Sequence, residues 1–172
     1  MTDFNYRKPT SGKQIKKAAP RGTKISLYSD LSSDPRPAYQ VLSDLPRNNI
    51  ILIQDPDRMN TGHWVSLSFH PESREIFFFS SYGGKPDEEK NMWMPVEKQR
   101  RSRQNRNVLN DGLKYFARRG WTVHYNDVPY QVIGDQSATC GVWATAFLRS
   151  GKNPDYFGEH HCSPEEYYYR YF

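Results

Sequence analysis

Apolar and polar residues alternate in several short segments of the chain, and this pattern predicts β-strands. Residues 50–53 are a β-branched run typical of a buried strand. Residues 63–69 alternate apolar with polar side chains, and a Phe-rich segment at 75–82 follows them after turn-forming residues. These two segments predict a β-hairpin, and a further short strand is predicted at 121–125.

Helical periods predict three helices. They are a short one at 38–45, a long one from about residue 96 to 119, and a third at 140–149 that ends before Gly151. The mixture of elements predicts the α+β class, with a small central mixed sheet flanked by helices.

The first 25 residues show no apolar period and are rich in basic side chains. We expect a flexible basic N-terminal arm over residues 1–25 and a single domain over 26–172. The basic residues of the arm are Lys8, Lys13, Lys16, Lys17, Arg21 and Lys24.

Composition narrows the classes of protein. The 172 residues suit one domain; only 36% are hydrophobic but 15% are aromatic, so the core must contain many large rings. No apolar run is long enough to span a bilayer and the N-terminus lacks an apolar leader, so we expect no membrane association and no secretion. Two cysteines cannot build a disulfide framework, which favours free thiols in a reducing compartment.

Two residues could carry nucleophilic chemistry. Cys140 stands where a polar loop meets an apolar helix, and a helix N-terminus favours the thiolate; Gly141 would let a substrate backbone approach. His63 follows Gly62 at a strand start, where it could face a cleft. The competing interpretations are a buried structural cysteine and a surface histidine.

The predicted hairpin places a possible partner beside His63. If its turn centres near Glu72, positions whose numbers sum to about 144 pair. His63 then lies across from residues 80–82, close to Ser80 and Ser81. A residue there could orient the imidazole as the third member of a catalytic triad.

A metal site is not expected. His160, His161 and Cys162 are adjacent, but no second pair of ligands stands at a zinc-like spacing. We expect no cofactor.

Three sequence blocks together resemble the adenain/Ulp1-like cysteine proteases. The blocks are Gly-His-Trp-Val at 62–65, Phe-Phe-Ser-Ser-Tyr-Gly at 78–83 and Ser-Ala-Thr-Cys-Gly-Val-Trp at 137–143. Within that family, the resemblance is strongest to the maturation proteases of adenoviruses, virophages, polinton-like elements and large DNA viruses. The blocks occur in the family's order over about half of the chain.

The resemblance implies roles for individual residues. Cys140 would be the nucleophile and His63 the general base, with Trp64 and Gly141 at the substrate. The family also uses a Gln upstream of the cysteine as an oxyanion donor. Gln131 fits slightly better than Gln136, and both stay open.

Ser80 departs from the family pattern, which places an Asp, Glu or Asn at this position. Three interpretations compete. The Ser80 hydroxyl could itself accept the imidazole N–H or hold a water that does, which would give a weaker triad. Alternatively, an acid such as Asp87 could supply a carboxylate from the following loop, or the chain could be catalytically impaired. A thiol ionises more easily than a hydroxyl, so a missing acid need not abolish activity.

The expected function is that of a cysteine endopeptidase, a thiol protease that cuts viral capsid or structural precursors at Gly-containing sites during virion maturation. Its expected places are the virion and the host cytoplasm or viral factory, and the chain is expected to be a monomer. The alternatives are an isopeptidase for ubiquitin-like proteins, or an impaired capsid- or DNA-binding component. The basic arm and Arg100–Arg106 could bind DNA, although a solvated basic face is the competing interpretation.

Overall fold

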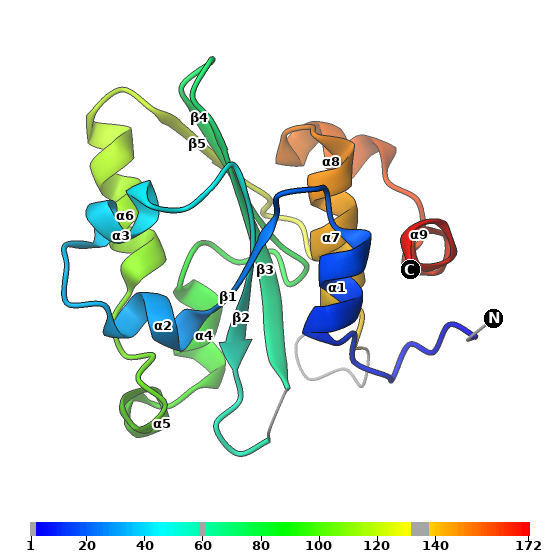
Figure 1. The fold of residues 1–172 in the computed structure, drawn as a ribbon, viewed down its shortest axis with the longest axis horizontal. Helices are drawn as coiled ribbons and strands as arrows, with labels where there is room; N and C mark the ends of the chain where they lie inside the picture. Colours follow the sequence, from blue (N-terminus) through cyan, green and yellow to red (C-terminus); the bar gives the residue numbers. More distant parts are fainter. Residues whose placement is uncertain (1–2, 59–60, 132–137) are drawn as a thin grey trace.

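The protein has three layers, with a central sheet between two groups of helices (Figure 1). The computed structural model describes residues 3–58, 61–131 and 138–172. Helices α2 to α6 lie on one side of the sheet, and α1, α7, α8 and α9 lie on the other. Within the described residues, no helix is long and apolar enough to cross a membrane.

The sheet has five strands in the order β1-β2-β3-β4-β5. β1 pairs with β2 in parallel, β2–β3 and β3–β4 are antiparallel, and β4–β5 is parallel. This mixed sheet with flanking helices confirms the predicted α+β class. The strands are β1 (Lys24–Leu27), β2 (Asn48–Gln54), β3 (Gly62–His70), β4 (Glu75–Ser80) and β5 (Thr122–Tyr125).

Side chains of the central strands pack alternately into two hydrophobic cores, one on each face of the sheet, because neighbouring residues of a strand point to opposite faces. In β4, Phe77 and Phe79 join the core with α1, α7, α8 and α9, while Ile76 and Phe78 join the core with α2, α3 and α6. The run at 50–53 is apolar throughout because both faces of β2 are covered.

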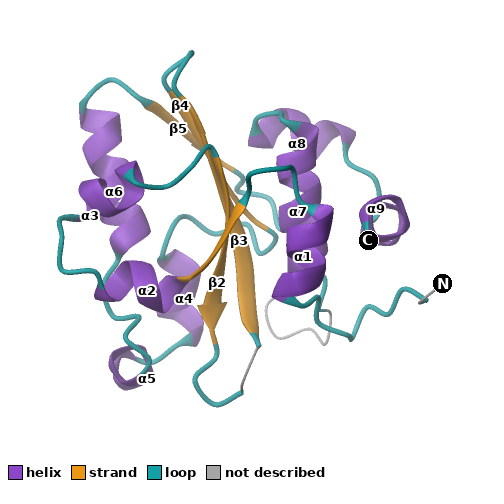
Figure 2. Cartoon of the chain, in the orientation of Figure 1, coloured by secondary structure: helices purple, strands orange, loops and turns teal. Residues whose placement is uncertain are grey.

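The helices are mostly short (Figure 2). They are α1 (Gly12–Ala18), α2 (Tyr28–Ser33), α3 (Ala38–Ser43), α4 (Glu88–Trp93), α5 (Val96–Arg101), α6 (Val108–Arg118), α7 (Cys140–Ser150), α8 (Pro154–His160) and α9 (Pro164–Tyr171).

The helix predicted from residue 96 to 119 is in fact two helices, α5 and α6. Between them the chain turns at Arg103, whose φ is 57°, and buries the side chain of Gln104. That amide exchanges two hydrogen bonds with the backbone of Gln54, so it continues the pairing at the end of β2. Hydrogen bonds between this side chain and the backbone at the end of β2 are a tertiary contact, and helical periodicity cannot predict such a contact.

The prediction of a flexible N-terminal arm is wrong for the described part of that segment. Ser11 caps α1 through a capping box with Gln14, and Ile15 is completely buried against the β-sheet core. β1 then adds a parallel strand to β2. The lysines and arginines obscured the pattern, because only one face of a seven-residue helix is apolar.

Replacing Ile15 by Ala should lower the free energy of unfolding by about 3 kcal/mol, because it leaves a cavity in a fully packed core. Denaturant unfolding of the purified protein measures this. The matched control is Lys16→Ala on the exposed face of α1, with an expected change within about 0.5 kcal/mol. Equal stability of the two variants would mean that the segment does not pack in solution.

Candidate active site

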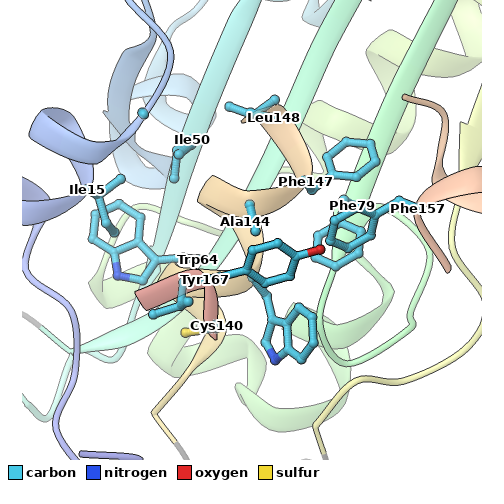
Figure 3. Close-up of a cluster of buried hydrophobic side chains, with 14 of the residues drawn as sticks. Ile15, Ile50, Trp64, Phe79, Cys140, Ala144, Phe147, Leu148, Phe157 and Tyr167 are labelled. Carbon is cyan, nitrogen blue, oxygen red and sulfur yellow. The ribbon is translucent and has the colours of Figure 1, made fainter. Parts of the chain in front are cut away.

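Cys140 is the first residue of α7, a helix that is apolar along most of its length and buried between the sheet and α9. Its side chain belongs to the apolar cluster, and the residue is 7% exposed. Figure 3 shows Cys140 at the margin of this cluster, with Ile15 and Trp64 to one side. The N-terminal amides of a helix have no intrahelical acceptor, so they favour a thiolate at this position.

The electrostatics of Cys140 favour the thiolate. Burial alone would raise the pKa of the thiol, but the His63 imidazole and the backbone amides of Trp64 and Gly141 lower the pKa below its ordinary value. These interactions favour the thiolate, which is the nucleophilic form of a cysteine.

His63 lies near the start of β3, opposite Ile53 of β2, and is 2% exposed. The Tyr82 ring stacks on the imidazole with 4.1 Å between ring centroids. Burial lowers the pKa of His63, but the interactions with the Cys140 thiol and the Glu89 carboxylate outweigh it and raise the pKa to about 9. The raised pKa of His63 and the lowered pKa of Cys140 both favour the charged forms, so each group stabilises the other as an imidazolium or a thiolate.

The two ring nitrogens of His63 have different surroundings. Nε2 lies 2.8 Å from Ser80 Oγ and 3.2 Å from Glu89 Oε2. Nδ1 is buried and makes no hydrogen bond within the described part of the chain. With Nε2 engaged by the oxygens, Nδ1 is the nitrogen left to exchange a proton with the thiol.

Ser80 joins the histidine to a carboxylate. Its hydroxyl donates to Glu89, with distances of 2.7 and 2.6 Å to the two carboxylate oxygens. Since a hydroxyl has one proton, Ser80 Oγ accepts from the Nε2–H of His63. The first interpretation of Ser80 thus holds in geometry, and a carboxylate stands behind the hydroxyl.

That carboxylate is Glu89 and not Asp87, which corrects the second interpretation. The Asp87 carboxylate accepts from the Tyr28 hydroxyl and from the amide of Asn110 at 2.7 Å, away from His63. Asp87 anchors the start of α4 to α2 and α6, and the first turn of α4 presents Glu89 to the histidine.

Glu89 sits in a pocket built to hold a carboxylate. The Gly84 amide donates to Glu89 Oε1 at 2.6 Å, and a Cβ on Gly84 would lie only 2.4 Å from Glu89 Cγ. Burial raises the pKa of Glu89, but His63, Ser80 and the Gly84 amide keep it below the ordinary value. Only a glycine at position 84 leaves room for the acid.

A buried lysine connects α4 to the segment that includes α5 and the residues before α6. Lys90 is fully buried, and its Nζ donates to Gln99 Oε1 at 3.0 Å, Gln104 O at 2.9 Å and Asn107 Oδ1 at 3.1 Å. Asp87 and Lys90 thus flank Glu89 in sequence and anchor the helix that carries it.

Sequence reasoning missed Glu89. It stands in the run Asp87–Lys90, which has the appearance of a solvated charged loop. The sequence carried only an indirect signal for this acid. A Gly-Gly pair follows β4, and a run with several acids comes soon after it, close enough in sequence to supply the carboxylate that position 80 lacks. Nothing local distinguished Glu89 from Glu88, which is exposed.

Gln131 contacts the residue that precedes Cys140. Its amide oxygen accepts from Ser81 Oγ at 2.9 Å and from Thr139 Oγ1 at 3.2 Å, and Thr139 directly precedes Cys140. With the oxygen so engaged, the amide nitrogen is the donor end of this side chain. The other candidate, Gln136, lies outside the described residues.

A small cavity of about 100 Å³ opens at Cys140. Trp64 and Tyr82 line it, together with Pro9 and Thr10 of the N-terminal segment. Trp64, expected at the substrate, therefore lines the same cavity as Cys140.

Gly141 packs closely against the N-terminal segment. A Cβ on this residue would lie 2.9 Å from Ile15 Cδ1, 3.1 Å from Thr10 Cβ and 3.3 Å from Trp64 Cδ1. The packing of the N-terminal segment on the start of α7 requires a glycine at this position, and a role for Gly141 at the substrate stays a prediction.

The basic residues at 100–106 are only partly available. Arg101 pairs with Asp57, and Arg106 donates to the backbone oxygens of Asp34 and Arg36. Arg100 and Arg103 are exposed, as are the lysines of α1. DNA binding by these residues stays a prediction.

No group of three or more potential metal ligands occurs among the residues for which positions are given. The two cysteines within the same residues are both free thiols. The chemistry available at this site is that of a thiol, an imidazole, a hydroxyl and a carboxylate.

Comparison with known proteins gives one viral relative. The chain is 30% identical over 126 residues to the uncharacterized protein V9 of the Sputnik virophage, and the match covers 72% of this chain. It covers 66% of the virophage protein, so the chain spans about two thirds of that relative's length. No family model matches the sequence. The similarity links the chain to a viral protein, and the name of that protein states no activity.

Proposed function

We propose that this chain is a cysteine endopeptidase of the adenain/Ulp1-like type. One observation carries the proposal: a buried histidine is hydrogen-bonded through Ser80 to a buried carboxylate and is electrostatically coupled to a thiol at the start of a helix. Structural cysteines in apolar cores have raised pKa values, so the lowered pKa of Cys140 favours the catalytic interpretation.

Each residue has a defined step. The Cys140 thiolate attacks the carbonyl carbon of the scissile peptide, and a tetrahedral oxyanion forms. His63 Nδ1 then gives its proton to the leaving amine as the C–N bond breaks, leaving a thioester on Cys140. A water molecule then attacks the thioester while His63 removes a proton from that water. The C–S bond breaks, the carboxylic acid product leaves, and the thiolate of Cys140 forms again.

The oxyanion requires preorganised donors. The backbone N–H of Cys140 and the amide nitrogen of Gln131 are the donors in this proposal, because Gln131 is fixed by Ser81 and Thr139 beside the nucleophile. Glu89 and Ser80 hold the imidazole with Nε2–H facing away from the thiol, which keeps Nδ1 toward it.

The substrate class follows from the size of the cavity and the viral relationship. A cavity of about 100 Å³ between Trp64 and Tyr82 suits a residue with little or no side chain, such as glycine. The similarity to a virophage protein supports a polypeptide of the virion as substrate, processed in the virion or the infected cell. Cleavage after glycine is shared by the second candidate, an isopeptidase for ubiquitin-like proteins, which the same cavity would serve.

A peptide that carries a vinyl sulfone after a C-terminal glycine tests the proposal. We expect a covalent adduct on Cys140 near neutral pH, formed at least about tenfold faster than with alanine before the warhead, because one methylene in a tight pocket costs about this factor. Intact-mass and peptide mapping measure the reaction.

Cys162 is the internal control, since this partly buried thiol lies outside the site. Equal labelling of both cysteines, or none on Cys140, would contradict an activated nucleophile. Faster labelling by a folded ubiquitin-like protein with the same warhead would favour the isopeptidase.

A further inference from the structure

A second and larger pocket lies between the segment Asn126–Tyr130, the helix α8 and the first turn of α7. Its volume is about 550 Å³, within the range of ligand-binding clefts. It shares no lining residue with the cavity at Cys140. It is thus a separate recess on the same scaffold.

The rim of this pocket is acidic. Asp127, Asp155 and Glu159 line it and are exposed, and no ion pair to a described residue involves them. This local concentration of carboxylates occurs on a chain whose formal net charge is +5. The three carboxylates do not come close enough together to form a metal-binding group. A cation that extends over several ångströms fits them better than a metal ion.

The inner wall is aromatic. Tyr130 and His161 have ring centroids 4.9 Å apart, and both pack on Trp143, at 4.9 and 5.3 Å. Gly158 of α8 leaves space for the Tyr130 hydroxyl, since a Cβ there would lie 3.1 Å from that oxygen. Flat rings beside carboxylates suit a guanidinium group, which stacks on aromatic faces and makes paired hydrogen bonds to carboxylates.

The pocket is tied to the catalytic strand. Asn126, which lines it, accepts from the Ser80 amide at 3.0 Å and donates to the Ser80 carbonyl at 2.6 Å. The Tyr130 amide donates to the Ser81 carbonyl at 2.7 Å. Gln131 follows directly, so a polypeptide bound in the pocket would contact the segment that carries the proposed oxyanion donor.

We propose that this pocket is an exosite that binds an arginine side chain of the polypeptide substrate, at a distance along the chain from the bond that is cut. The exosite role rests on the proposed protease function. The arginine-binding property does not, and can be measured with the nucleophile removed.

The binding test uses the Cys140→Ala protein and N-acetyl-arginine amide as the probe. The indole N–H signal of Trp143, identified by its loss in Trp143→Phe, should shift and saturate as the probe is added. N-acetyl-citrulline amide has nearly the same shape without the charge, and it should bind at least about fivefold more weakly.

Variants separate charge from packing. Asp155→Asn with Glu159→Gln should weaken arginine binding by about fivefold, while Glu165→Gln with Glu166→Gln, exposed acids of α9 outside the pocket, should leave it unchanged. Equal binding of citrulline, an unchanged affinity in the first pair, or no saturable shift would overturn the assignment.

A cleavage assay tests the exosite role in the otherwise unchanged protein. With a peptide substrate that carries a distant arginine, the Asp155/Glu159 variant should raise KM and leave kcat unchanged. Arginine binding without this KM effect would overturn the exosite role alone. Absence of cleavage by any variant would count against the protease, and the binding result would still decide the pocket.

Discussion

Replacing Cys140 by Ala should abolish the processing of a co-expressed virion precursor, lowering the rate of cleavage by about 10⁴-fold or more. The thiolate forms the covalent bond on which both halves of the proposed reaction depend, and no described side chain near His63 can replace it. Since Cys140 is buried in the apolar cluster and alanine is smaller and apolar, the fold should survive the change. Gel analysis of the precursor and its fragments measures the loss.

Cys162→Ala is the matched control, because it removes the other thiol of the chain and leaves the site intact. Its processing should equal that of the unchanged protein. Persistent cleavage by the Cys140→Ala protein, with purification excluding a contaminating protease, would remove the proposed mechanism. A precursor left intact by both proteins would remove that precursor as the substrate.

Replacing Glu89 by Gln should lower kcat/KM by about 10²-fold and move the alkaline limb of its pH profile to lower pH. The imidazolium–thiolate pair exists between the lowered pKa of Cys140 and the pKa of His63 near 9. Glu89 is one of the two interactions that raise the pKa of His63. Without the carboxylate, the imidazole loses its proton at lower pH, and the working range narrows from its alkaline side.

Glu88→Gln tests whether position matters more than charge. Glu88 is the neighbouring acid of α4 and is exposed, and its carboxylate accepts from the Lys85 amide at 3.0 Å. The pH profile of Glu88→Gln should match that of the unchanged protein.

Ser80→Ala should show an intermediate loss of kcat/KM, since Glu89 Oε2 lies 3.2 Å from His63 Nε2 and can still act on the ring directly. A Glu89→Gln profile with an unmoved alkaline limb would mean that the acid does not act on the histidine.

Much of the site was accessible from the residues alone. Strand and helix boundaries around His63, Ser80 and Cys140 follow from local periodicity and glycine positions, and these boundaries decide which residues stand at element ends. The observed register pairs Val65 with Ser80, a sum of 145 where about 144 was expected, and this brings His63 within reach of Ser80.

Other features of the site could not be predicted from the sequence, because they depend on contacts between residues that are far apart in the chain. Gly141 looked like a residue at which substrate could approach, but Ile15 and Thr10 fill the space above it. Ile15 itself was hidden in a basic segment with no visible period. Both features belong to one contact, between the N-terminal segment and the start of α7, across more than 120 residues of chain.

The sequence by itself determined the α+β class, four of the five strands and the positions of the thiol and the histidine, because short-range periodicity and turn residues specify where these elements begin. Only the tertiary structure decided which acid lies beside Ser80 and His63. Asp87, Glu88 and Glu89 are chemically similar neighbours, and the packing of α4 by Asp87 and Lys90, with the space left at Gly84, turns one of them toward His63. A carboxylate's role depends on burial and on the partners around it, and these are properties of the folded chain.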